Sequence, residues 1–136
     1  MKCLLDVNAL VAFGIREHEF HQRVANWFRA QHRKGTLELF TCSITELGFV
    51  RILAQTPGYG VTAPEARSLL LQIKAARAKV FSFLSDTHDI AHIPSWVKHP
   101  KQLTDGHLVQ LAKAHGAVLA TLDTAIPGAY LIPARS

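Results

Sequence analysis

The chain has 136 residues, of which 49% are hydrophobic and 18% are charged. This is enough apolar sequence for one packed core, too little for two ordinary domains, and too much for a disordered chain. Fifteen Lys and Arg against ten Asp and Glu give a formal net charge of +5, which favours binding to a polyanion such as nucleic acid. No apolar run approaches a membrane span and an acid already stands at position 6, so we expect a cytoplasmic protein without a leader peptide.

Hydrophobic periodicity in the first half of the chain predicts alternating strands and helices. Strands are predicted over 2–6 and 37–42, and helices over 7–13, 18–34 and 43–55. Each strand holds one of the two cysteines, which we expect to be buried free thiols. The inward positions predicted for the second helix are Phe20, Val24, Trp27 and Phe28, with Gln31 as a further candidate. For the third helix they are Leu47, Val50, and either Leu53 or Ala54.

The second half of the chain continues this alternation. A loop at 56–60 precedes a helix over 62–78, whose start is marked by Thr62, Pro64 and Glu65. Strands are predicted over 80–84, 117–122 and 129–132, and a helix over 105–115. Residues 85–103 have little periodicity and are predicted to be irregular.

Alternating strands and helices imply an α/β fold in which a central, mainly parallel sheet is flanked by helices on both faces. We expect residues 1–136 to form a single domain of this kind. The carboxyl ends of parallel strands lie on one edge of the sheet, where α/β proteins bind their ligands. Polar residues at strand-to-helix junctions are therefore the first candidates for a functional site.

Four acids occupy such junctions, and each also has an ordinary structural explanation. Asp6 follows a strand and suits the N-cap of the next helix, while Asp123 suits a turn after a strand. Ser43 and Glu46 fit a capping box. Asp105 follows a predicted Thr104 cap, where an acid favours the helix dipole.

Taken together, the four junction acids predict a metal site. In a parallel sheet, the ends of strands and the starts of the following helices meet at one edge. Carboxylates that converge there repel one another unless a cation lies between them, and Mg²⁺ or Mn²⁺ prefers such hard oxygen ligands. A basic surface around an acidic site favours a metal-dependent enzyme that acts on a polyanion.

Four segments around these acids resemble a known family. They are Leu4-Leu-Asp-Val-Asn-Ala-Leu10, Ser43-Ile-Thr-Glu-Leu47, Thr104-Asp-Gly-His-Leu-Val-Gln-Leu-Ala112 and Leu119-Ala-Thr-Leu-Asp123. Their order and spacing, over nearly the whole chain, are similar to those of the PIN-domain ribonucleases, above all the VapC toxins of VapBC toxin–antitoxin pairs.

The resemblance implies a single PIN-like domain that acts as a metal-dependent endoribonuclease. The matching acidic quartet is Asp6, Glu46, Asp105 and Asp123, with Asn8, Thr104 and Arg51 in supporting positions. The resemblance also implies a Mg²⁺ or Mn²⁺ cofactor, an RNA substrate, a small inhibitory antitoxin that inserts a basic side chain among the acids, and a homodimer. Two departures from the family pattern are Gly106 in place of a more usual Ala, and the sequence 124–127 after the fourth acid.

Other functions remain open from the sequence. The altered sequence after Asp123 suits a catalytically weakened PIN-like module that binds RNA or protein without cleaving it. A phosphoacceptor receiver domain is disfavoured because no lysine follows a strand at the required place. His88, Asp89 and His92 resemble part of a zinc or HD-type phosphohydrolase site, but ordinary surface histidines fit them better. A flap-type nuclease would need additional elements to grip DNA.

Overall fold

A five-stranded sheet lies at the centre of the computed structural model, which describes residues 1–134. Its strands are β1 (Lys2–Leu5), β2 (Glu38–Cys42), β3 (Phe81–Leu84), β4 (Val118–Thr121) and β5 (Tyr130–Leu131). They are ordered β3-β2-β1-β4-β5, and every neighbouring pair is parallel. The predicted parallel sheet is confirmed, and each strand end lies within one residue of its predicted position.

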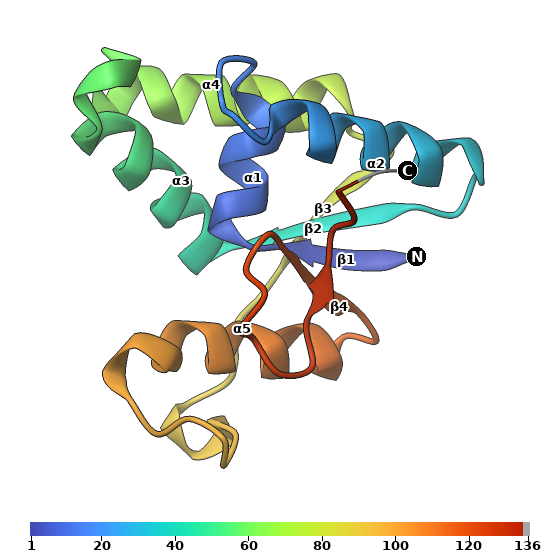
Figure 1. The fold of residues 1–136 in the computed structure, drawn as a ribbon, viewed down its shortest axis with the longest axis vertical. Coiled ribbons are helices and arrows are strands. Elements are labelled where there is room, and N and C mark those ends of the chain that lie inside the picture. Colours follow the sequence, from blue (N-terminus) through green and yellow to red (C-terminus); the bar gives the residue numbers. More distant parts are fainter. Residues whose placement is uncertain (135–136) are drawn as a thin grey trace.

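Helices cover both faces of the sheet, as predicted (Figure 1). One face carries α1 (Val7–Gly14), α2 (His21–Arg33), α3 (Ser43–Gln55) and α4 (Ala63–Ala76), and the other carries α5 (Leu103–Ala114). Short 3-10 turns occupy Pro57–Tyr59, Ile90–His92 and Pro100–Gln102. Within residues 1–134, no helix is both long and apolar enough to cross a bilayer.

The alternation of side chains along β1 divides the core into two layers. Cys3 and Leu5 pack with α1–α4, whereas Leu4 points to the other face and packs with Leu108 and Leu111 of α5. Cys3 is a buried free thiol, as predicted for both cysteines, and its burial raises its pKa to about 12. Such a thiol is unreactive at neutral pH, so its role is packing.

The strand order creates a switch point between β1 and β4. The chain first moves outward from β1 to β2 and β3, and then returns through α5 to place β4 on the other side of β1. Because crossovers between parallel strands are right-handed, this change of direction moves α5 to the face opposite α1–α4. In such sheets the crevice for a ligand opens where the direction changes, at the carboxyl ends of the two strands.

Two predicted helix caps are wrong, although the helix predicted to begin at Ser43 does begin there. The predicted capping box of Ser43 and Glu46 does not form, because Cys42 is the N-cap residue and its N–H donates to the Thr45 hydroxyl over 3.0 Å. Glu46 is therefore free to make other contacts. Thr104 is not a cap either, since α5 already begins at Leu103.

The predicted inward face of α3 is also wrong at Leu47, which is 62% exposed. Leu53 is fully buried as predicted, and Phe49 is fully buried although it was not predicted to be. The reason is Gly48, which lets α1 come close: a Cβ atom there would lie only 2.5 Å from Val7 Cγ2. Helix α3 thus turns Gly48 toward α1 and leaves Leu47 on the side that faces α4.

In α2, the predicted stripe of inward side chains is confirmed for Val24 and Trp27, which are buried, but not for Phe20. Phe20 precedes the helix, which begins at His21, and is 39% exposed. Its N–H donates to His18 Nδ1 over 3.0 Å, so the segment before His21 is held as a turn.

Candidate active site

Three of the four predicted acids surround one cleft at the switch point. Asp6 directly follows β1, Asp123 follows β4 by two residues, and Asp105 lies in the first turn of α5. Together with Asn8 they line a cleft of about 350 Å³. These side chains come from three separate parts of the chain, and the reversal of strand order brings them together.

Asp6 is buried and held at both carboxylate oxygens. Its Oδ1 accepts from the Val7 N–H over 2.8 Å, which makes it the N-cap of α1 as predicted, and its Oδ2 accepts from the Thr121 hydroxyl over 2.7 Å. Burial raises the pKa of Asp6, these two donors act against that rise, and the charge of Asp123 adds to it. The carboxylate therefore has a fixed position but an unfavourable environment for its charge.

Asp105 is half-buried, and its surroundings oppose ionisation more strongly. Burial raises its pKa to about 6, and the charges of Asp6 and Asp123 contribute to the increase. The adjacent Gly106 allows the irregular segment to pack against α5, since a Cβ atom there would lie 2.5 Å from Val97 Cγ2. The first turn of α5, which carries Asp105, is therefore packed at Gly106 against Pro94 and Val97.

Asp123 is exposed and is the third aspartate that lines the cleft. Its Oδ1 accepts from the Ala125 N–H over 2.8 Å, so it does form the predicted turn. Its charge raises the pKa of both Asp6 and Asp105, which places it near enough to interact with each. The turn and a role in the site are thus compatible for this residue.

A hydroxyl that the sequence analysis missed connects these residues. Thr121 is fully buried at the end of β4, donates to Asp6, and accepts from the Asp123 N–H over 3.0 Å. The Asn8 amide donates to Thr121 Oγ1 over 3.3 Å, while its oxygen accepts from the Leu122 N–H over 3.2 Å. The signal available in the sequence was a hydroxyl residue two positions before an acid at a strand end.

Glu46 lies apart from this cleft. It lines a separate groove of about 630 Å³ between α3 and α4. Its Oε2 accepts from Lys74 Nζ over 2.5 Å and from the Thr41 hydroxyl over 2.6 Å. Lys74 comes from α4, and the pair depends on how α3 packs on α4, which no local pattern in the sequence reveals.

Two supporting residues from the sequence analysis are exposed. Thr104 is the second residue of α5, and Arg51 lies on α3, one turn beyond Glu46. Across residues 1–134, neither side chain makes a hydrogen bond or an ion pair. Their assignment to the site therefore remains a prediction.

The remaining lining of the cleft forms an apolar and aromatic wall. It is formed by Val7 and Val11 of α1, Ile52 of α3, Tyr59 of the first 3-10 turn, and His18. Burial lowers the pKa of His18, with the nearby Glu19 opposing and His21 adding to this shift. The sequence analysis identified neither His18 nor Tyr59, because both lie in turns without a motif.

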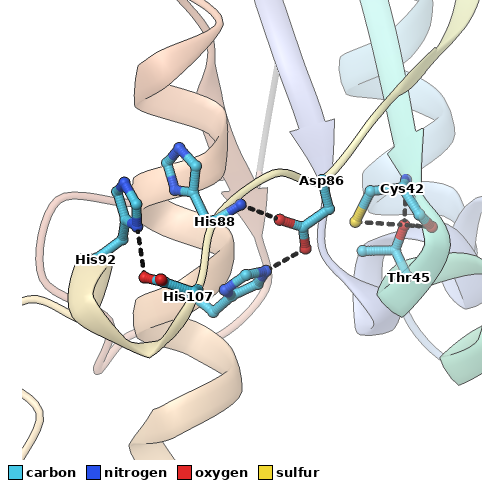
Figure 2. A network of polar contacts seen from close by, with 7 residues as sticks. Cys42, Thr45, Asp86, His88, His92 and His107 are labelled. Carbon is cyan, nitrogen blue, oxygen red and sulfur yellow. Dashed lines mark hydrogen bonds and ion pairs between the residues drawn. The ribbon is translucent and has the colours of Figure 1, made fainter.

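The histidines considered as a zinc or HD-type site stack on one another and donate hydrogen bonds to neighbouring acids (Figure 2). Asp86 accepts from His107 of α5 and from the His88 N–H, while Asp89 accepts from His92 over 3.2 Å. The rings of His88 and His92 are stacked, with centroids 4.2 Å apart and planes 18° apart. Stacked rings do not direct their nitrogens at one ion, so the structure gives the zinc interpretation no support.

The donor set of the acidic cleft suits a hard divalent cation. Mg²⁺ and Mn²⁺ prefer carboxylate and amide oxygens, and a cation would stabilise the charge of Asp105, which burial and the repulsion from Asp6 and Asp123 oppose. As the side chains lie, no three His, Cys, Asp or Glu side chains in the described part of the chain are close enough to hold an ion. The chemistry of the residues therefore fits, and binding requires the three aspartates to draw closer together.

Comparison with known proteins identifies the class to which this fold and cleft belong. The model of the PIN domain matches residues 3–130, nearly the whole chain. The chain therefore belongs to the PIN-domain family.

The similar proteins within that family are VapC ribonucleases. Ribonuclease VapC44 of Mycobacterium tuberculosis is 36% identical over 95% of this chain and 94% of its own length. Ribonuclease VapC38 of the same organism is 35% identical over 90% of this chain and 86% of its own. The expected resemblance to VapC proteins is thus confirmed.

Two solved structures share the fold. The first is M. tuberculosis VapC20, described as a toxin that cleaves the sarcin–ricin loop, with a TM-score of 0.66 at 13% identity over 96% of this chain and 99% of that one. The second, DNA-bound VapBC from Salmonella typhimurium, has a TM-score of 0.54 at 18% identity over 96% of both chains. At such identities the likeness concerns the fold alone.

Proposed function

We propose that this chain is a metal-dependent endoribonuclease that acts as the toxin of a type II toxin–antitoxin pair. In this proposal Asp6, Asp105 and Asp123 hold Mg²⁺ or Mn²⁺, and Glu46 is the fourth carboxylate of the quartet. The observation that carries it is the crowding of three carboxylates in the switch-point cleft, with the pKa of Asp6 and Asp105 raised. Relatives named ribonucleases, which match nearly the whole chain, support the choice of RNA.

The chemistry that a bound divalent cation supplies is the activation of a water and the neutralisation of charge on a scissile phosphate. The protein's own contribution is to position the ligands. Thr121 and the Val7 N–H each hold one oxygen of Asp6, so this carboxylate is the fixed ligand toward which the side chains of Asp105 and Asp123 would turn. Asn8 ties the start of α1 to the end of β4, which keeps the two backbone segments that carry Asp6 and Asp123 together. The net charge of +5 attracts RNA to the surface.

The test is cleavage of single-stranded RNA by the purified chain with Mg²⁺ or Mn²⁺, and again with EDTA. We expect Asp6→Asn to reduce cleavage by about a thousandfold or more, the scale of loss seen when essential catalytic groups are removed. Glu38→Gln is the matched control, because Glu38 is an exposed acid at the amino end of β2, the opposite edge of the sheet. Metal-stimulated cleavage that survives in Asp6→Asn would contradict the proposal.

The alternative is a PIN-like module that binds RNA or protein without cleaving it. The contact that favours it is the Lys74–Glu46 ion pair, which occupies one member of the quartet. In that case the wild-type chain would bind RNA equally well with and without EDTA and leave it intact. Cleavage that depends on Asp6 excludes this alternative.

The proposed partners are an antitoxin and a second copy of the chain. An apolar groove between α3 and α4 supports a protein partner, since Leu47, Leu71 and Phe83 expose 62%, 48% and 49% of their surface there. Native mass spectrometry of the chain alone, and of the chain co-expressed with the product of a neighbouring reading frame, would report both partners. We expect Leu71→Glu to weaken the assembly that covers this groove, while RNA cleavage by the isolated chain is preserved.

A further inference from the structure

The cleft that holds the three aspartates is lined by side chains of two kinds. Asp105 and Asp123 contribute carboxylates, whereas Ile52, Tyr59 and His18 contribute the apolar and aromatic wall. Both kinds line one cavity of about 350 Å³, within the range of small-ligand sites. A metal ion and its waters need only oxygen ligands, so the apolar and aromatic wall is available to another part of a ligand.

Tyr59 is placed by the turn that links α3 to α4. Its ring packs partly against the core, and the turn ends at Gly60, whose φ of 62° suits a glycine. The side chain is therefore anchored on the core, and it lines both this cleft and a neighbouring cavity beside Leu53 and Leu69. Among the hydrogen bonds of residues 1–134, none involves the Tyr59 hydroxyl, so the ring is not positioned by that group.

His18 presents a defined hydrogen-bond donor. Its Nδ1 accepts from the Phe20 N–H over 3.0 Å, so in the neutral ring the proton is on Nε2. The side chain lines the same cleft as Tyr59 and is only partly buried. The wall thus combines an aromatic face, two aliphatic side chains of α1, and one N–H donor.

We propose that this wall, centred on Tyr59 and His18, is a subsite for a single unstacked RNA base next to the phosphate to be cleaved. An aromatic ring stacks on any base, and an N–H donor favours bases that present an acceptor. The position fits, because a base and its own phosphate are neighbours in a nucleotide, and this wall and the aspartates line one cleft. This subsite rests on the proposed function, in that RNA is the ligand of the acidic site.

A consequence is that paired RNA is a poor substrate near the cut. A base inside a helix is stacked on its neighbours and must leave them to reach Tyr59. Loops, bulges and single strands offer such bases without that cost. The subsite therefore selects unpaired RNA through the shape of the cleft.

The test combines protein variants with a modified substrate. A single-stranded oligoribonucleotide that the wild type cleaves is compared with the same strand made abasic on either side of the cut. We expect the abasic residue at one of these positions to reduce both affinity and kcat/KM by about tenfold, within the range for loss of one base stack. Tyr59→Leu should lose the same factor on the intact strand and little more on the abasic one, and Tyr59→Phe should resemble the wild type.

Binding is measured separately from cleavage, by fluorescence anisotropy in EDTA. If the wild type binds RNA with this Tyr59 dependence but never cleaves it, the proposed function fails and the subsite stands. If the wild type cleaves RNA but Tyr59→Leu loses equal activity on intact and abasic strands, the ring is only structural and the subsite is wrong. Wild-type binding and cleavage of RNA by Tyr59→Leu would also overturn the subsite. That result would indicate that the wall binds a side chain of a protein partner instead.

The role of His18 has its own measurement. Sequencing the cut ends of a random single-stranded RNA pool gives the base preference next to the cut. We expect His18→Ala to reduce that preference, whereas His115→Ala should not, because His115 is exposed at the far end of α5. An identical preference in His18→Ala and the wild type would remove His18 from the subsite.

Discussion

The acids at the carboxyl edge of the sheet occupy two different environments. Asp6, Asp105 and Asp123 share a cleft in which, among residues 1–134, no lysine or arginine forms an ion pair with them. Glu46, on the neighbouring helix, accepts from both Lys74 and Thr41 at a single oxygen. The three aspartates are therefore a site of uncompensated charge, and Glu46 is part of a compensated pair.

This difference indicates where a cation has most to gain. Like charges in a cleft destabilise the folded protein, so they are retained where a ligand relieves the repulsion. A carboxylate already paired with lysine offers a cation less, because the existing contact must be broken first. A bound cation would thus stabilise the three aspartates more than Glu46, although all four acids lie at similar junctions in the sequence.

The most direct test of the difference between the two environments is to remove one acid from each of them. Loss of a residue that only supports a metal ligand costs about ten- to a hundredfold in affinity. We therefore expect Asp123→Asn, which removes a direct ligand, to lower Mn²⁺ affinity by about a hundredfold or more. Glu46→Gln should lower it by about tenfold or less, because Glu46 is already paired with Lys74. Electron paramagnetic resonance titration of Mn²⁺ measures both. If Glu46→Gln were the more damaging change, the inequality between the two environments would be wrong.

The second prediction concerns the hydroxyl that holds the buried aspartate. Thr121→Val removes the donor to Asp6 Oδ2 while keeping the volume of the side chain. We expect about a tenfold loss in kcat at saturating metal, because the ligand is less well oriented. Thr121→Ser should restore most of the rate. Equal loss of activity in the serine and valine variants, at unchanged thermal stability, would exclude this positioning role.

The third prediction uses the raised pKa of Asp105, which comes first from burial and then from the charges of Asp6 and Asp123. Folding raises the pKa of Asp105 to about 6, so between about pH 4 and 6 the folded state holds a proton that the unfolded state has lost. The charge of Asp105 therefore lowers the stability of the metal-free protein as pH rises through this range. Because Asp105 is half-exposed, solvent screening limits the effect to about 1 kcal/mol or less.

The measurement is thermal unfolding in EDTA of the wild type and Asp105→Asn from pH 4 to 8. We expect the variant to be more stable above pH 6, by up to roughly 3–5 °C, and the difference to vanish near pH 4. Glu38→Gln serves as the control for loss of an exposed acid. A difference between Asp105→Asn and the wild type that stayed constant with pH would exclude this origin.

The smallest expected effect is that of the ion pair. Lys74 and Glu46 keep 24% and 26% of their side-chain surface exposed, so their coupling should be near the upper end of values for surface pairs, about 0.5–1 kcal/mol. A double-mutant cycle with Lys74→Met and Glu46→Gln in urea unfolding measures it. Zero coupling at low salt would show that the contact does not balance the charge of Glu46 in solution.

Much of the fold and part of the site could be predicted from the sequence. The strands were found because a short apolar run is visible locally, and Asp6 was identified as a cap because its neighbours on both sides indicate the junction. That Asp6, Asp105 and Asp123 share one edge follows from parallel strands, whereas their meeting in one cleft depends on the strand order that places β4 beside β1.

The remaining features depend on tertiary contacts. Lys74 reaches Glu46 only because α4 packs on α3, and the two residues are 28 positions apart. Leu47 was wrongly placed in the core because apolar periodicity cannot detect that Gly48 admits α1. Tyr59 and His18 lie in turns, where side chains have no periodicity, so only the folded structure shows that they line the same cleft as the aspartates.

Gly106 links the acidic cleft to a segment with little regular structure. A methyl group at position 106 would lie 2.5 Å from Val97 and 3.2 Å from Pro94, closer than packed atoms tolerate. A relative with alanine at this position must therefore carry a smaller residue than valine at 97, or route that segment differently. Positions 97 and 106 are thus expected to change together in evolution. The absence of a side chain at position 106 is therefore what allows residues 94–97 to pass so close to the first turn of α5.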